Sequence, residues 1–78
     1  MKEKNIIGLR IRKARKKAGM TQMELAAQMQ VLGIPIERSG IAKLETGRRP
    51  VSDIEIAAIS RILKITVAWL FEGEETVK

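Results

Sequence analysis

Glycines and prolines divide this 78-residue chain into segments of helical length. Those that separate the segments stand at Gly19, at residues 33–35, at residues 47–50 and at Gly73. Both residue types interrupt regular structure, because glycine readily adopts positive φ and proline lacks a backbone N–H. The intervals between them predict helices over residues 5–18, 22–32, 38–45, 53–63 and 67–72, with residues 73–78 as a polar tail.

Capping side chains mark the starts of these segments. Thr21 with Glu24, and Ser52 with Glu55, match the pattern in which two side chains satisfy the free backbone donors of a first helical turn. Asn5 and Thr66 are further N-cap candidates. Local signals and segment lengths therefore agree on helices.

Apolar residues recur at helical spacing within each segment. Ile7, Ile11, Ala14 and Ala18 share one face of the first, and Leu32 and Ile56 extend the apolar stripes of the second and fourth. The predicted core consists of Ile11, Leu25, Met29, Ile41, Leu44, Ile59 and Leu63. Aromatic residues make up only 3% of the chain, which favours packed helices over a β-sandwich. We expect one all-α domain spanning residues 1–78.

The chain contains no Cys and no His, which excludes several classes of site. Disulfides, thiolate and imidazole metal sites and the commonest general base are all missing. No glycine-rich phosphate loop is present either. We therefore expect no catalytic residues, no metal and no cofactor, and a core too small for an effector pocket. Without a signal peptide or an apolar run of about 18 residues, we expect a cytoplasmic location and no membrane association.

Positive charge is concentrated in the first two thirds of the chain. Residues 1–49 carry 12 Lys and Arg against 4 Asp and Glu, whereas residues 50–78 carry 3 against 5, for a net charge of +6. One end of the fold is therefore expected to attract polyanions. Charge alone leaves open a solvated lysine-rich face without a partner.

Several segments, in order, resemble the lambda-repressor-like, Cro-type helix-turn-helix family, also called Xre-type regulators. The resemblance covers about residues 7–71 and is carried by residues 7–8, 11–15, 19–26, 39–50 and 65–70. It implies a five-helix domain that binds double-stranded DNA, regulates transcription by occupying an operator, more often as a repressor, and acts as a homodimer on a palindromic site.

The chain departs from the family pattern at three places. The stretch between the second and third helices, residues 30–37, is longer than the compact turn of the family, which leaves the docking angle open. Thr46 replaces the usual Asn at a helix end. Lys64 replaces a usual Gly, and positive φ at this residue would cost about 1 kcal/mol.

The third helix has the features of a helix that reads the major groove. The resemblance places base-reading side chains at Arg38, Ser39 and Lys43, and Gly40 and Ala42 are short enough to let a duplex approach. Arg38 suits a bidentate bond to guanine, and Ser39 bonds either donors or acceptors. For Lys43, guanine and phosphate both remain open.

Other residues are assigned to the DNA backbone or to the fold. Gln22 starts a helix, where free amides attract phosphate, and the resemblance implies that it touches the DNA backbone. The predicted backbone contacts are Gln22, Arg48, Arg49 and Lys17. The resemblance also implies a structural ion pair between Arg15 and Glu45. A dimer interface is expected at Ile65, Val67, Trp69 and Phe71, because a small core has difficulty hiding them all.

Three alternatives use the same residues. An antitoxin-like protein-interaction module would favour an acidic third helix rather than a basic one. A membrane-surface protein would need a stronger apolar stripe than the Ala-rich first segment offers. RNA binding usually exposes aromatic residues for stacking, and this chain has none before Trp69.

Overall fold

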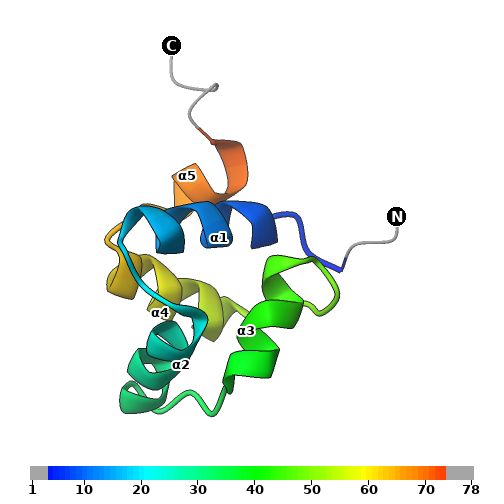
Figure 1. The fold of residues 1–78 in the computed structure, drawn as a ribbon. Coiled ribbons are helices and arrows are strands. Elements are labelled where there is room, and N and C mark those ends of the chain that lie inside the picture. Colours follow the sequence, from blue (N-terminus) through cyan, green and yellow to red (C-terminus); the bar gives the residue numbers. More distant parts are fainter. Residues whose placement is uncertain (1–3, 74–78) are drawn as a thin grey trace.

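The computed structural model describes residues 4–73, which form helices and no strand (Figure 1). The helices are α1 (Gly8–Lys17), α2 (Gln22–Val31), α3 (Arg38–Glu45), α4 (Asp53–Leu63) and α5 (Val67–Glu72). α3 packs against α1 and α2, while α4 packs against α1, α2 and α5. In Figure 1, α2 and the loop leading into α3 lie at one end of the molecule, and α5 lies at the other end beyond α1. Among residues 4–73, no helix has the length and apolar character needed to cross a bilayer.

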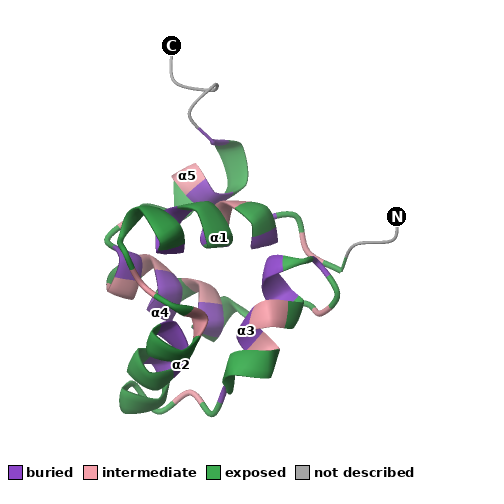
Figure 2. Ribbon diagram, viewed as in Figure 1, coloured by how far each residue is buried: buried purple, intermediate pink, exposed green. Residues whose placement is uncertain are grey.

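The core is built by all five helices and matches the seven residues predicted for it, each of which is at most 7% exposed. Ile7, Ile36 and Leu70 add further buried side chains. The buried faces turn toward one another in Figure 2. Two predicted stripe residues are wrong: Ala18 is exposed, and Leu32 is 43% exposed. They are the C-caps of α1 and α2, where the chain leaves the helix and helical spacing no longer sets the direction of a side chain.

The predicted caps of three helices are present. Thr21 Oγ1 accepts from the Glu24 backbone N–H at 3.0 Å, while the Glu24 carboxylate accepts from the Thr21 N–H at 2.8 Å. Ser52 and Glu55 form the same reciprocal pair at the start of α4. Thr66 Oγ1 accepts from the Trp69 N–H at 3.0 Å. Each cap satisfies donors that have no partner within the helix.

The first helix begins three residues later than predicted, at Gly8 rather than at Asn5, and ends at Lys17. Asn5 nevertheless uses Oδ1 to accept from the N–H groups of Ile7 and Gly8, at 3.1 and 2.7 Å. Its Nδ2 donates to the carbonyl oxygens of Leu44 and Arg49. Asn5 therefore ties the N-terminal segment to the end of α3, a bond across the fold that local spacing does not reveal.

The long connection between α2 and α3 is anchored to the core. α2 ends at Val31, one residue before the predicted end. Ile36 is buried, and Gln30 Nε2 donates to the Ile36 carbonyl at 2.8 Å. A Cβ on Gly40 would lie 2.8 Å from Ile36 Cγ1, so glycine is needed there to accommodate Ile36. Gly40 therefore has a packing role, and its expected part in the close approach of DNA stays a prediction.

Lys64 adopts the left-handed conformation, with φ 57° and ψ 46°, at the C-terminus of α4. This is the strained position anticipated from the missing glycine. Of the predicted tail, Gly73 is the C-cap of α5, and residues 74–78 lie outside the described residues.

Candidate nucleic-acid interface

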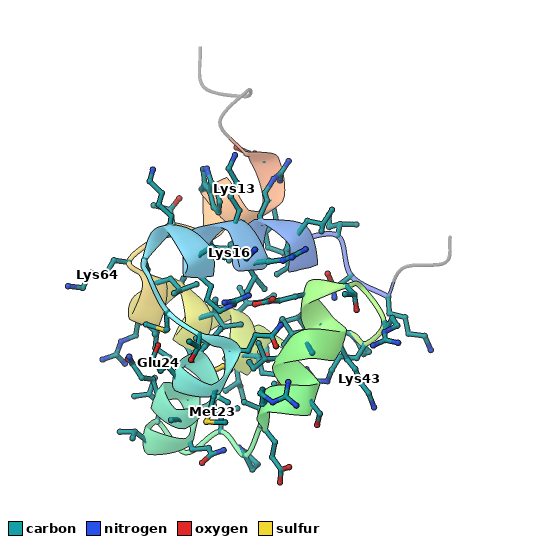
Figure 3. The ribbon with its side chains drawn as sticks, in the orientation of Figure 1. Lys13, Lys16, Met23, Glu24, Lys43 and Lys64 are labelled. Atoms are coloured by element: carbon teal, nitrogen blue, oxygen red, sulfur yellow. The ribbon has the colours of Figure 1, made fainter. Side chains whose placement is uncertain are left out.

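α3 presents one face to solvent and the other to the core. Ile41 and Leu44 are fully buried, whereas Arg38, Ser39 and Lys43 are exposed and Ala42 is half-buried. Lys43 extends away from the helical bundle in Figure 3. The predicted base-reading residues therefore form one exposed, cation-bearing ridge. Its eight residues span about 12 Å, and the major groove admits a helix of this kind.

Glu37 is a residue of this surface that the sequence interpretation missed. It is the N-cap of α3, is exposed, and its side chain makes no capping hydrogen bond. A carboxylate at this position adjoins Arg38 and is able to accept a hydrogen bond from the cytosine amino group. The sequence feature that could have revealed it is an acidic residue directly before a helix whose exposed face is basic.

A buried ion pair holds the end of α3 against α1. Arg15 Nε donates to Glu45 Oε2 at 2.6 Å, and Arg15 Nη2 donates to Glu45 Oε1 at 3.0 Å. Arg15 Nη1 also donates to the Met20 carbonyl, and Gln22 Nε2 donates to Glu45 Oε1 at 3.1 Å. The hydrogen bond to Glu45 holds the pKa of Arg15 above its ordinary value, although burial opposes this effect. The network joins α1, α2 and α3 at one point.

Gln22 therefore belongs to this network as well as to the first turn of α2. Its side chain is half-buried and bonded to Glu45, which holds it at the junction of α2 and α3. The second N–H of the Gln22 amide is not used by that bond, and the predicted contact of this side chain with the DNA backbone stays a prediction.

The two arginines after α3 have different partners. Arg48 is exposed, and its Nε donates to Thr46 Oγ1 at 3.2 Å. Arg49 is half-buried and makes a bidentate pair with Glu55, at 3.0 and 3.2 Å. Burial alone would raise the pKa of Glu55, but hydrogen bonds from Arg49 and Ser52 together hold it below its ordinary value. The sequence interpretation assigned both arginines to DNA and missed this pairing.

Lys17 is exposed near the end of α1, and its predicted contact with the DNA backbone stays a prediction. It lines a groove between α1 and the turn from α4 to α5, and no residue of α3 lines that groove. The exposed cations that lie on or next to α3 are Arg38, Lys43 and Arg48.

The four predicted dimer residues, in α5 and just before it, differ in exposure. Val67 and Phe71, four residues apart and therefore on one helical face, are 44% and 43% exposed. Ile65 and Trp69 are half-buried and pack against the core.

The described residues contain no group of three or more His, Cys, Asp or Glu that could hold a metal ion.

Comparisons with known proteins give one family match and several similar solved structures. A sequence model of the helix-turn-helix family matches residues 11–70. A comparison with curated proteins gives no match. Similar solved structures include the P22 c2 repressor in complex with a synthetic operator, which is 24% identical with a TM-score of 0.73 over 90% of this chain and 98% of that chain.

Two further solved structures are similar. The restriction-modification controller protein C.AhdI from Aeromonas hydrophila is 32% identical, with a TM-score of 0.71 over 83% of this chain and 87% of that chain. A chain of the SinR–SinI complex is 28% identical, with a TM-score of 0.70 over 94% of this chain and 68% of that chain.

Proposed function

We propose, from the premise that this chain belongs to the lambda-repressor-like, Xre-type helix-turn-helix family, that it regulates transcription by binding a double-stranded DNA operator through α3. The observation that carries the proposal is the two-sided α3, with Arg38, Ser39 and Lys43 exposed opposite buried Ile41 and Leu44. A ridge of long donors over short residues fits the edges of bases in the major groove.

The residues divide between affinity and sequence choice. Arg48 supplies a phosphate contact that does not depend on sequence, and the first turn of α2 at Gln22 offers a second site for phosphate. Arg38 reads guanine, and the neighbouring carboxylate of Glu37 accepts from cytosine. The Arg15–Glu45 pair contacts no DNA in this proposal; it fixes the direction in which α3 projects.

The finer mechanism is repression by occupancy, without catalysis, by a homodimer on a palindromic operator. The P22 c2 repressor, solved on an operator, and the controller protein C.AhdI support regulation of this kind. Val67 and Phe71 provide an exposed apolar face for a two-fold interface. Such a dimer would set two copies of α3 about 34 Å apart, one turn of the duplex. Access to DNA also requires the cytoplasmic location expected from the sequence.

Selection of binders from a random duplex library tests the proposal. The wild-type protein should select a two-fold symmetric sequence, and Arg38→Ala should weaken binding to it by about 1–3 kcal/mol and lose preference at one base pair. Arg61→Ala, which removes an exposed arginine of α4, is the matched control and should change neither. Recovery of no preferred duplex would contradict the function. Equal weakening of all sequences by Arg38→Ala would limit that residue to phosphate.

Salt dependence separates the two arginines that follow α3. Arg48→Ala should reduce the slope of log K against log salt by about one unit on any duplex. Arg49→Ala should leave the slope nearly unchanged, because that guanidinium is paired with Glu55. An unchanged slope for Arg48→Ala would remove Arg48 from the interface.

Sedimentation of the protein with and without operator tests the dimer. The wild-type protein should sediment as a dimer on DNA, and Phe71→Glu should shift it toward a monomer with weaker operator binding. A monomer at micromolar concentration in both conditions would overturn the dimeric arrangement while leaving the reading of DNA by α3 intact.

A further inference from the structure

A groove of about 330 Å³ lies between the C-terminal half of α1 and the turn from α4 to α5. Leu63, Ile65 and Trp69 provide apolar lining, and Lys13, Lys17 and Lys64 contribute three cationic side chains. No acidic residue lines it. Figure 3 shows Lys64 and Lys43 on opposite sides of the molecule, so this second cationic surface is separate from that of α3.

The chemistry of the groove is that of a site for an anion with an apolar body. Its volume lies at the lower end of the range for small-molecule sites, about 300 Å³ and above. An anion placed between Lys17 and Lys64 is attracted to both cations. Trp69 offers a broad apolar surface that is only half-buried.

The backbone at Lys64 provides a second, independent observation. This lysine holds the left-handed conformation, which glycine would adopt without strain. A cation favours the C-terminal end of a helix, but α4 already carries Arg61 in its last turn. The left-handed turn ends α4, with the Ile65 N–H bonded to the Ser60 carbonyl at 3.0 Å, and glycine would form it without strain. The lysine side chain therefore adds an ammonium group to the groove that the turn itself does not require.

We propose that this groove binds a small anionic ligand that has an apolar body. The anionic group lies between Lys17 and Lys64, and the apolar body lies against Trp69. The site is a surface groove and not a pocket in the core, which is why a sequence search for an effector pocket overlooks it. Binding at this groove does not depend on the proposed function.

The only tryptophan of the chain lies in this groove, so its fluorescence reports occupancy directly. The probe is 1-anilinonaphthalene-8-sulfonate, an aromatic sulfonate. It should quench Trp69 by energy transfer and saturate at one molecule per chain. Lys17→Gln and Lys64→Gln should each weaken binding about three-fold, and together about ten-fold, as expected for solvent-exposed charges. Lys16→Gln, on the outside of the same helix, should have no effect.

The neutral dye N-phenyl-1-naphthylamine separates charge from apolar contact, and it should bind about ten-fold more weakly than the sulfonate. Circular dichroism checks that each variant keeps its helical fold. If Lys64→Gln folds poorly, Lys64→Gly replaces it, because glycine removes the cation and the backbone strain together. Equal affinity for both dyes, or unchanged sulfonate binding in the double variant, would overturn the proposal. So would a loss of binding in Lys16→Gln equal to that in the groove variants.

Discussion

Two arginine–glutamate pairs flank the C-terminal end of α3, and they differ in their surroundings. Arg15 and Glu45 join α1 to α3, with side chains 7% and 1% exposed. Arg49 and Glu55 join the following loop to α4, with side chains 33% and 10% exposed. Both pairs are bidentate. The more buried pair, Arg15–Glu45, orients α3, whereas the more exposed pair, Arg49–Glu55, supports only the loop that follows α3.

Burial changes what each pair contributes. Removing Arg15 and Glu45 from water carries a large desolvation cost, which is offset by their mutual attraction together with the hydrogen bonds to Met20 and from Gln22. Such a pair gives direction to α3 more than it gives net stability. Water is able to hydrate Arg49 if Glu55 is lost, so breaking the second pair should cost less stability. The second pair also does less to fix the direction of α3.

The largest expected effect comes from breaking the buried pair on one side. Glu45→Ala leaves the guanidinium of Arg15 buried without its carboxylate, and should lower the free energy of unfolding by about 3–5 kcal/mol. Urea denaturation at neutral pH measures it. The double variant Arg15→Met with Glu45→Leu should recover most of the loss, because it leaves no unpaired charge. A loss below about 1 kcal/mol for Glu45→Ala would contradict the contrast between the pairs.

The packing that brings the buried pair together depends on Gly8. A Cβ on Gly8 would collide with the carbonyl oxygen of Leu44, which belongs to the backbone of α3 and has little room to move. Gly8→Ala should therefore push α1 away from α3 and lower the free energy of unfolding by about 1–3 kcal/mol. Leu9→Ala, at a neighbouring side chain that is 72% exposed, is the control, and should stay within about 0.5 kcal/mol of wild type. Equal losses of unfolding free energy in Gly8→Ala and Leu9→Ala would show that the close approach of Gly8 to the Leu44 carbonyl does not matter for stability.

Local patterns predicted the fold well because they act within a few residues. The box of Thr21 with Glu24 lies inside a single turn, and Ile41 and Leu44 face the core because of helical spacing. The start of α1 was placed at Asn5, whose partners include Leu44 and Arg49, far along the sequence. Spacing along the chain carries no information about such contacts.

The site was predictable to the extent that it depends on one helix. The exposed face of α3 followed from its spacing, and the resemblance supplied the pairing of Arg15 with Glu45. The surroundings of Arg49 and Lys17 depend on elements that are distant in the sequence, so neither the resemblance at Arg49 nor the charge of Lys17 revealed them.

The smallest expected effect is the pH dependence of the more exposed pair. The pKa of Glu55 is held below the ordinary 4.5 in the folded protein, mainly by Arg49 once burial is overcome. Its contribution to stability is therefore fully present above the unfolded pKa and is lost as the pH falls through the lower folded pKa. Glu55→Gln should lower the free energy of unfolding at pH 7 by no more than about 1 kcal/mol, and this deficit should vanish in acid.

Urea denaturation at several pH values below 7 gives the loss of unfolding free energy caused by Glu55→Gln. Comparing this loss in the wild-type and Arg49→Gln backgrounds shows whether Arg49 causes the pH dependence. Without the guanidinium, only the Ser52 bonds lower the pKa of Glu55, while burial still raises it. The change in the Glu55→Gln deficit with pH should therefore be smaller in Arg49→Gln. An identical pH profile in both backgrounds would show that the hydrogen bonds from Ser52 alone lower the pKa of Glu55. The Arg49–Glu55 pair would then contribute nothing to holding the loop after α3.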